Sequence, residues 1–207
     1  MYEKRIPHPL VKDVEWHDVP PFVMITHLKD SEDTLKKFME DCQKILVTGQ
    51  TFLPVMIDSF GGHVYTSLGI VDFLNGLDEV EVVTICTTKA MSGGVIVFSA
   101  GKRRFASPSA TFMVHEVSSV NWGKNVEIQN EAKETERLNK LLFRTLDKNL
   151  DKPEGFWWGK VKENEHADLF MDSKKAVEMG LVTNVGIPHI VTSLDVRKDM
   201  VFEGKVI

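Results

Sequence analysis

Residues 80–100 read VEVVTICTTKAMSGGVIVFSA, and this stretch decides which fold we expect. The β-branched residues 80–86 are typical of a buried strand, and the apolar residues 91–100 favour a short buried helix. A strand that alternates with a helix is characteristic of layered α/β proteins. We therefore expect an α/β fold in which residues 87–94 join one of the strands to the following helix.

The same alternation continues on both sides of this segment. Strands are predicted over residues 22–27, 52–57, 104–106, 111–115 and 169–171. Helices are predicted from a cap at Ser31, over 63–77, over 125 to about 150, and from a cap at Asp172 or Ser173 to an end at Gly180. The long amphipathic helix invites packing against another subunit.

Composition and charge exclude several classes of protein. The 207 residues are 43% hydrophobic and 27% charged, which is ordinary for one soluble globular domain. The net charge of -5 provides no positive field for nucleic acid. Cys42 and Cys86 lie in apolar contexts and are expected to be core thiols in a reducing compartment. Because residues 1–9 do not resemble a secretory signal and no apolar run would span a bilayer, we expect a cytoplasmic protein with no membrane partner.

Ser92 lies among small residues at the junction of the predicted strand and helix. It has two interpretations. As a helix cap it would satisfy an unpaired backbone amide, and the local sequence favours this role. As a nucleophile it would lie beside amides that stabilise negative charge, with Gly93 allowing a substrate to come close.

Two further features lie at predicted strand ends. The turn Ser59-Phe60-Gly61-Gly62 follows a strand, where α/β folds bind ligands, although a paired glycine is also common in a simple tight turn. His115 ends another strand and is suited to a catalytic base, with a structural histidine as the alternative. Neither a phosphate-binding loop nor a histidine pattern for zinc is present, so no metal is expected.

Taken together, these segments resemble the proteolytic subunit of the Clp protease family, in order from about residue 22 to residue 186. Residues 59–62 resemble the family's Ser-Pro-Gly-Gly, and 90–94 resemble the end of Gly-x-Ala-Ala-Ser-Met-Gly. Residues 112–115 resemble the start of Met-Ile-His-Gln-Pro, and 168–171 resemble Asp-Arg-Phe-Leu. The order of the matches carries more weight than any single motif.

The resemblance implies a serine endopeptidase in which Ser92 is the nucleophile, His115 the general base and Asp168 the acid that orients the histidine. Asp172 is a competing candidate for the acid, although it is also suited to cap a helix. The reaction needs no cofactor in this chain, and ATP would be used only by a separate partner ATPase.

The resemblance also implies where substrate binds. The backbone amides of Gly62 and Gly93 would form the oxyanion hole. Gly62, His63 and Val64 would pair with an extended peptide as an added strand. Such pairing recognises backbone and therefore tolerates many substrate sequences.

The implied architecture is a ClpP/crotonase-like fold of stacked ββα units with a long protruding handle helix. We expect a divergent amino-terminal arm over 1–20, a peptidase domain over 21–186 whose handle covers about 117–150, and a carboxy-terminal extension over 187–207. The family assembles as a homo-oligomer of two stacked heptameric rings, a tetradecamer, with its active sites inside a chamber. An AAA+ Clp unfoldase is the expected partner, although residues 1–20 do not match the family's docking region.

Five substitutions distinguish this chain from the family pattern: Phe60 replaces proline, Thr88 glycine, Gly93 methionine, and Glu116-Val117 the Gln-Pro after the histidine. Ser92-Gly93-Gly94 also resembles signal-peptide peptidases, which use a serine and a lysine but lack the Met-Val-His segment. Two more hypotheses are compatible with the sequence. The chain could be an inactive ring or scaffold subunit, or an acyl-CoA-binding protein of the crotonase type.

Overall fold

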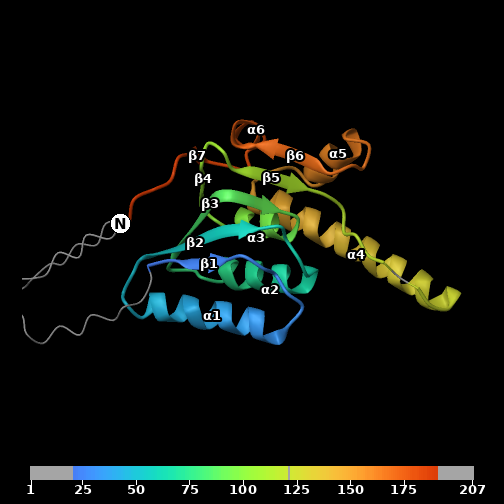
Figure 1. The fold of residues 1–207 in the computed structure, drawn as a ribbon, viewed down its shortest axis with the longest axis horizontal. Helices are drawn as coiled ribbons and strands as arrows, with labels where there is room; N and C mark the ends of the chain where they lie inside the picture. Colours follow the sequence, from blue (N-terminus) through green and yellow to red (C-terminus); the bar gives the residue numbers. More distant parts are fainter. Residues whose placement is uncertain (1–20, 121, 191–207) are drawn as a thin grey trace, which may run out of the picture.

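Strand β3 (Glu81–Met91) lies at the centre of a mixed sheet in the computed structural model, which describes residues 21–120 and 122–190 (Figure 1). Its neighbours on the main path run parallel in the order β1-β2-β3-β4-β7. A second branch adds β5 parallel to β3, and β6 antiparallel to β5. The bounds of these strands are β1 Val23–Ile25, β2 Phe52–Ser59, β4 Arg103–Ala106, β5 Thr111–Val114, β6 Leu169–Asp172 and β7 Asn184–Val185.

Helices separate most of the strands along the chain, so the α/β fold expected from the sequence is confirmed. In Figure 1 the amino-terminal part of the long helix α4 extends well beyond the rest of the fold. This helix begins at Asn125, as predicted, and its first turns are exposed. The helices are α1 Glu32–Leu46, α2 Val64–Asn75, α3 Gly93–Ser99, α4 Asn125–Asn149, α5 Phe156–Glu163 and α6 Ser173–Glu178.

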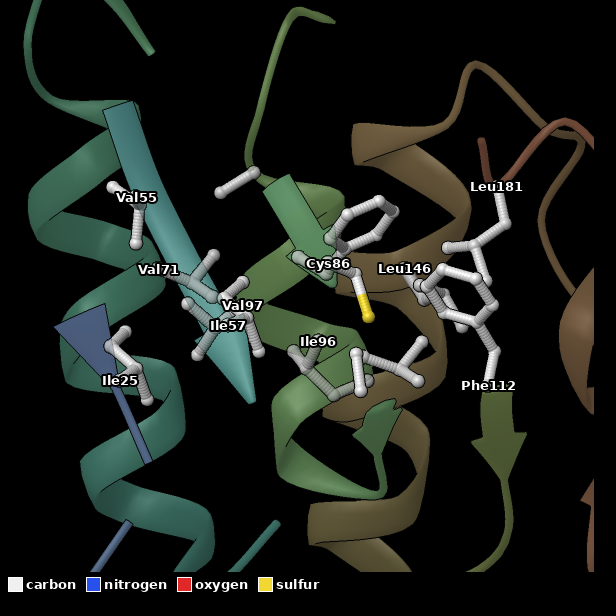
Figure 2. Close-up of a cluster of buried hydrophobic side chains, with 14 of the residues drawn as sticks. Ile25, Val55, Ile57, Val71, Cys86, Ile96, Val97, Phe112, Leu146 and Leu181 are labelled. Atoms are coloured by element: carbon white, nitrogen blue, oxygen red, sulfur yellow. The ribbon is translucent and has the colours of Figure 1, made fainter. Parts of the chain in front are cut away.

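The core lies between the sheet and the six helices of the described residues, all of which contribute buried apolar residues to it, and Figure 2 shows part of it. Ile57 from β2, Val97 from α3 and Leu146 from α4 are each at most 1% exposed. Burying a side chain of this size stabilises the folded state by about 1.5–3 kcal/mol. Burial also raises the pKa of both Cys42 and Cys86 to about 12, so the prediction of core thiols is confirmed.

Strand β3 is bent where it approaches Ser92. Its residues 83–86 pair with β4, whereas 89–91 pair with β5. On β2, Ile57 pairs with Cys86 and Ser59 with Ala90, so two steps along β2 correspond to four along β3. The extra residues form a bulge, which bends and twists a strand. The prediction of a strand ending at 86 and a helix from 91 was wrong because the bulge interrupts the apolar pattern while the strand continues.

Helix α5 was not predicted from the sequence. It begins after Gly155, which has a φ of 86°, and its residues Phe156-Trp157-Trp158 have only moderate helix propensity. The carboxylate of Asp147 on α4 accepts hydrogen bonds from the amides of Gly155 and Trp157, at 2.7 and 3.0 Å. The start of α5 therefore depends on a residue of another helix, which a local sequence pattern cannot show.

The capping residues predicted for α1 and α6 differ in whether their side chains make a capping hydrogen bond. Ser31 precedes α1, but its hydroxyl contacts Thr34 Oγ1 and makes no capping hydrogen bond. Asp172 caps α6 as predicted, because its carboxylate accepts from the amide of Lys175 at 2.7 Å. Gly180, with a φ of 77°, follows the end of α6 as expected of a terminating glycine.

Candidate active site

Ser92 occupies the sharp turn between β3 and α3, with φ 53° and ψ -126°. A non-glycine residue with positive φ is strained, and such strain is held only where the surrounding structure fixes it. Here the amide of Ser92 donates to the carbonyl of Met113 on β5 at 2.8 Å, and the helix that follows is fully buried. The side chain makes no capping hydrogen bond, so the interpretation of Ser92 as a side-chain cap was wrong.

The hydroxyl of Ser92 instead faces His115. Its Oγ lies 2.8 Å from His115 Nε2, which is hydrogen-bond distance. The two residues are 23 positions apart in sequence, and the pairing of β3 with β5 brings them together. In this arrangement the imidazole can accept the hydroxyl proton of the serine.

The antiparallel ladder of β5 and β6 explains how Asp168 reaches the other ring nitrogen of His115. The last pair of the ladder is Val114 with Leu169, so one further step brings His115 opposite Asp168. Asp168 Oδ1 lies 3.4 Å from His115 Nδ1, longer than a good hydrogen bond but close enough for an ion pair. The carboxylate is 51% exposed, compared with 23% for the imidazole.

Asp172 does not compete with Asp168 for this position. It lies opposite Thr111 at the other end of the same ladder, and its carboxylate caps α6. The sequence left the two aspartates as rival candidates, and the geometry brings only Asp168 to His115.

The turn Gly61-Gly62 packs directly against Ser92. Gly61 has a φ of +100° and Gly62 a φ of +149°. A Cβ on Gly61 would lie 2.6 Å from Ser92 Cβ, and one on Gly62 would lie 2.1 Å from the carbonyl oxygen of Leu28. Both positions therefore require glycine, for conformation and for space.

Gly62 and Gly93 lie at the same pocket as Ser92 and His115. Within residues 21–120 and 122–190, neither of these two glycine amides donates a hydrogen bond to a backbone carbonyl. A Cβ on Gly93 would lie 2.3 Å from Ser67 Oγ, so a side chain at this position, where the family pattern has methionine, would require Ser67 to shift.

His63 differs from the expectation for a peptide-pairing segment. Its amide already donates to the carbonyl of Leu28 at 2.7 Å, and its own carbonyl accepts from Ser67. The N–H group of His63 is therefore engaged within the chain, and the pairing of His63 with a peptide stays a prediction. For Gly62 and Val64, which both line the pocket, the role stays a prediction.

The pocket beside Ser92 has a volume of about 220 Å³ and a largely apolar wall. Glu116 lies at it next to His115, whereas no lysine lines it among the described residues. The hypothesis of a serine–lysine pair therefore finds no support in this geometry. The apolar side chains of the wall come from α2, α3, β5, the loop after β5, and α4: Val64, Val95, Ile96, Val114, Val117, Leu142 and Phe143.

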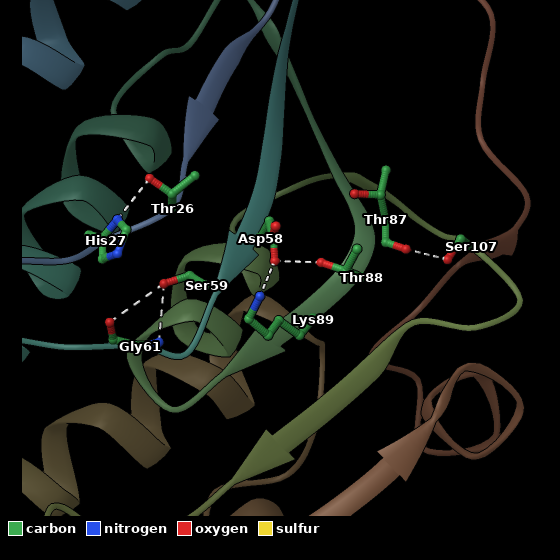
Figure 3. Close-up of polar contacts among 9 residues, drawn as sticks. All are labelled: Thr26, His27, Asp58, Ser59, Gly61, Thr87, Thr88, Lys89 and Ser107. Carbon is green, nitrogen blue, oxygen red and sulfur yellow. Dashed lines mark hydrogen bonds and ion pairs between the residues drawn. The ribbon is translucent and has the colours of Figure 1, made fainter.

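Lys89, the lysine nearest to Ser92 in sequence, is bound elsewhere (Figure 3). Its Nζ contacts the carboxylate of Asp58 at 2.5 Å, and Thr88 donates to the same oxygen. These two hydrogen bonds hold the pKa of Asp58 below its usual range. Lys89 Nζ also lies 4.4 Å from the ring centre of Phe60, the residue that replaces the family's proline. Asp58 on β2 thus binds both Thr88 and Lys89 in the bulge of β3, and Phe60 packs on the same lysine.

Two asparagines that support the site were missed in the sequence. Asn139 Oδ1 accepts from the amide of Val117 at 2.7 Å, and Asn164 Nδ2 donates to the carbonyl of Asp168 at 3.2 Å. Asn139 is only 7% exposed and follows the buried Leu138 on α4. A polar residue on the apolar face of an amphipathic helix is the signal that would have found it. Asn164 carries no such signal.

The part of the chain that is described meets neither the requirements of a metal site nor those of a membrane-spanning helix. Its His, Cys, Asp and Glu side chains form no group of three or more that could hold a metal ion. None of its helices is long and apolar enough to cross a membrane.

Comparison with known protein families gives a match to the sequence model of the family described as Clp protease. The match covers residues 46–189 and so contains Ser92, His115 and Asp168. It begins after the first strand and most of the first helix, which the sequence resemblance from about residue 22 had included. Since the match extends over more than half of the 207 residues, and the fold is the α/β arrangement that the family implies, the chain belongs to the Clp protease family as a ClpP-like member.

Proposed function

We propose that the protein is a serine endopeptidase that hydrolyses peptide bonds in unfolded proteins and short peptides. The observation that carries this proposal is the 2.8 Å contact between Ser92 Oγ and His115 Nε2, at a strained turn that opens on a pocket. A strained strand-to-helix turn exposes a serine hydroxyl for attack, and a neighbouring imidazole activates it.

In the proposed reaction, Ser92 Oγ attacks the carbonyl carbon of the scissile bond while its proton passes to His115 Nε2. The oxygen of the tetrahedral intermediate accepts hydrogen bonds from the amides of Gly62 and Gly93. His115 then gives the proton to the leaving amine, and the C–N bond breaks. A water molecule next loses a proton to His115 and attacks the acyl carbon. The C–O bond to Ser92 Oγ then breaks as His115 gives this proton to Oγ, which releases the acid and restores Ser92.

Asp168 has the role of fixing the ring of His115 and stabilising the imidazolium that forms. Its 3.4 Å distance from Nδ1 is long for that role. Catalytic hydrogen bonds are often long in a free enzyme and shorten when substrate binds. We propose that the carboxylate moves toward Nδ1 in the substrate complex.

We also propose that the active sites lie in the chamber of a homo-oligomer, with heptameric rings stacked as a tetradecamer in the cytoplasm. Members of the Clp protease family generally form oligomeric rings, which supports this proposal. The projecting part of α4 exposes Val126 and Ile128, which are 67% and 42% accessible and available for contact with another subunit. A separate AAA+ ATPase would deliver unfolded chains, and the predicted arm over residues 1–20 lies outside the described residues.

The test uses the purified oligomer and a fluorogenic peptide. We expect hydrolysis, covalent labelling of Ser92 by a fluorophosphonate, and loss of both in Ser92→Ala. Full activity in Ser92→Ala would overturn the assignment. An assembled oligomer that neither cleaves nor reacts would identify a scaffold subunit, whereas heat of binding with an acyl-CoA in calorimetry would indicate crotonase-type chemistry.

A further inference from the structure

A second contact between a histidine and an acidic residue lies next to the pair formed by His115 and Asp168. His166 Nδ1 contacts the carboxylate of Glu116. Glu116 directly follows His115, and His166 precedes Asp168 by two residues. The same two chain segments are thus joined twice, with the histidine and the carboxylate exchanged between them.

Both segments lie beyond the last backbone pair of the β5–β6 ladder. That pair is Val114 with Leu169, so the regular hydrogen bonds of the sheet stop just before the catalytic positions. The loop that follows α5 also has positive φ at Glu165 and His166, 55° and 60°. Such conformations are unfavourable for these residues unless contacts hold them.

Each segment is anchored to a different helix. The amide of Val117 donates to Asn139 on α4 at 2.7 Å. On the other side, the amide of His166 donates to the carbonyl of Val161 on α5 at 3.0 Å, and Asn164 donates to the carbonyl of Asp168. These anchors hold each segment to its own helix, and the two histidine–carboxylate pairs join the segments directly to each other.

The orientation of His166 is further restricted by Trp158. The two rings lie 6.2 Å apart between centres and meet edge to face, at 79°. His166 does not line the pocket beside Ser92, whereas Glu116 does. A change at His166 therefore alters the contact between the segments without removing a wall of the pocket.

We propose that Glu116 and His166 form a positioning clamp that sets the distance between Asp168 and His115. The inference rests on the proposed peptidase function and adds two positioning residues to it. The distance between Asp168 and His115 is sensitive to the clamp. The contact is long, and Asp168 is half exposed and lies at the end of an edge strand.

The first test measures turnover of the fluorogenic peptide by the full-length oligomer. In His166→Ala we expect kcat to fall roughly 10- to 100-fold with little change in KM, which is the effect of a small displacement in a catalytic group. His166→Gln keeps a donor for Glu116 and should recover most of the loss. Glu163→Ala, which removes an exposed ion pair of α5 with Lys160, is the matched control and should stay active.

The second test places His166→Ala in an Asp168→Ala background. A clamp that acts through Asp168 causes no further loss there, whereas a general structural defect lowers kcat by the same factor in both backgrounds. An equal loss of kcat in the two backgrounds, or a His166→Ala variant that keeps the wild-type kcat, would overturn the clamp. Thermal unfolding of each variant identifies any that fail to fold.

A readout independent of turnover separates failure of the clamp from failure of the proposed function. In proton NMR, the Nδ1–H signal of His115 reports its hydrogen bond to a carboxylate and is assigned by its change in Asp168→Ala. We expect the signal to move upfield in His166→Ala and to return in His166→Gln. If the wild-type oligomer cleaves no peptide but this signal behaves as expected, the peptidase proposal fails and the clamp stands. If the signal is unchanged in His166→Ala, the clamp proposal fails and the peptidase proposal is unaffected.

Discussion

The two sides of His115 are built differently. On its Nε2 side, Ser92 is fixed between β3 and the buried helix α3, and the contact is 2.8 Å. On its Nδ1 side, Asp168 lies beside the edge strand β6, half exposed, at 3.4 Å. Core packing therefore determines the position of the proposed nucleophile, whereas a peripheral segment determines that of the proposed acid. Variants on the two sides should differ in how much activity they lose and in whether stability changes with it.

The largest effect is expected from His115, which both sides share. His115→Ala removes the proposed base, and kcat should fall by a factor on the order of 10⁶. Because the imidazole is partly exposed and outside the main core, the melting temperature should change little. Steady-state peptide hydrolysis with thermal unfolding checks both expectations, and a loss below tenfold would show that another group takes the proton.

On the peripheral side, Asp168→Ala should lower kcat by a factor on the order of 10⁴. Its half-exposed carboxylate contributes little to folding, so stability should be unaffected. Asp172→Ala is the comparison, because it removes the cap of α6 and should cost about 1 kcal/mol of stability while most activity remains. The kcat of each variant and its free energy of unfolding in denaturant test these expectations. The reverse result would assign the acid to Asp172.

On the buried side, Gly61→Ala should lower kcat by roughly 10²–10³-fold by displacing the turn that carries the amide of Gly62. It should also lower the melting temperature, since its Cβ would collide with Ser92. Gly49→Ala is the matched control: its φ is +79°, but a Cβ there meets nothing within 4 Å. Similar activity in the two variants would contradict the importance of the Gly61 contact.

The smallest effect is expected from the bulge of β3. Lys89→Ala should lower kcat roughly tenfold, because it releases Asp58 and Phe60 near the glycine turn. Lys89→Arg keeps the charge and should retain more activity. The folded state lowers the pKa of the Asp58 carboxyl. The pair of Asp58 and Lys89 therefore stabilises the folded state above the unfolded-state pKa, and this stabilisation is lost as the pH falls through the folded-state pKa. The effect of Lys89→Ala should thus be present at neutral pH and diminish in acid.

The sequence predicted the buried side of the site better than the peripheral side. The β-branched run before Ser92, the strand ending at His115 and the glycine turn are local patterns, and each appears in the structure near its predicted place. Asp168 was found only through resemblance, because nothing in its local sequence distinguishes it from other turn carboxylates.

Features that depend on distant contacts were missed. The bulge of β3 is defined by its pairing with β2, and the start of α5 is capped by Asp147 from α4. The contact of Glu116 with His166 joins residues 50 positions apart. No periodicity or capping rule applied within a short window can show such partners.

The bulge of β3 has a consequence for insertions and deletions. Beyond it, residues 89–91 pair with β5, and the strand leads directly into Ser92. Because side chains alternate between the two faces of a strand, one residue added or removed at 87–89 would turn every following side chain to the opposite face. The chain can therefore vary the residues of the bulge, as it does with Thr88, but their number is fixed by the side of the sheet on which Ser92 must lie to reach His115.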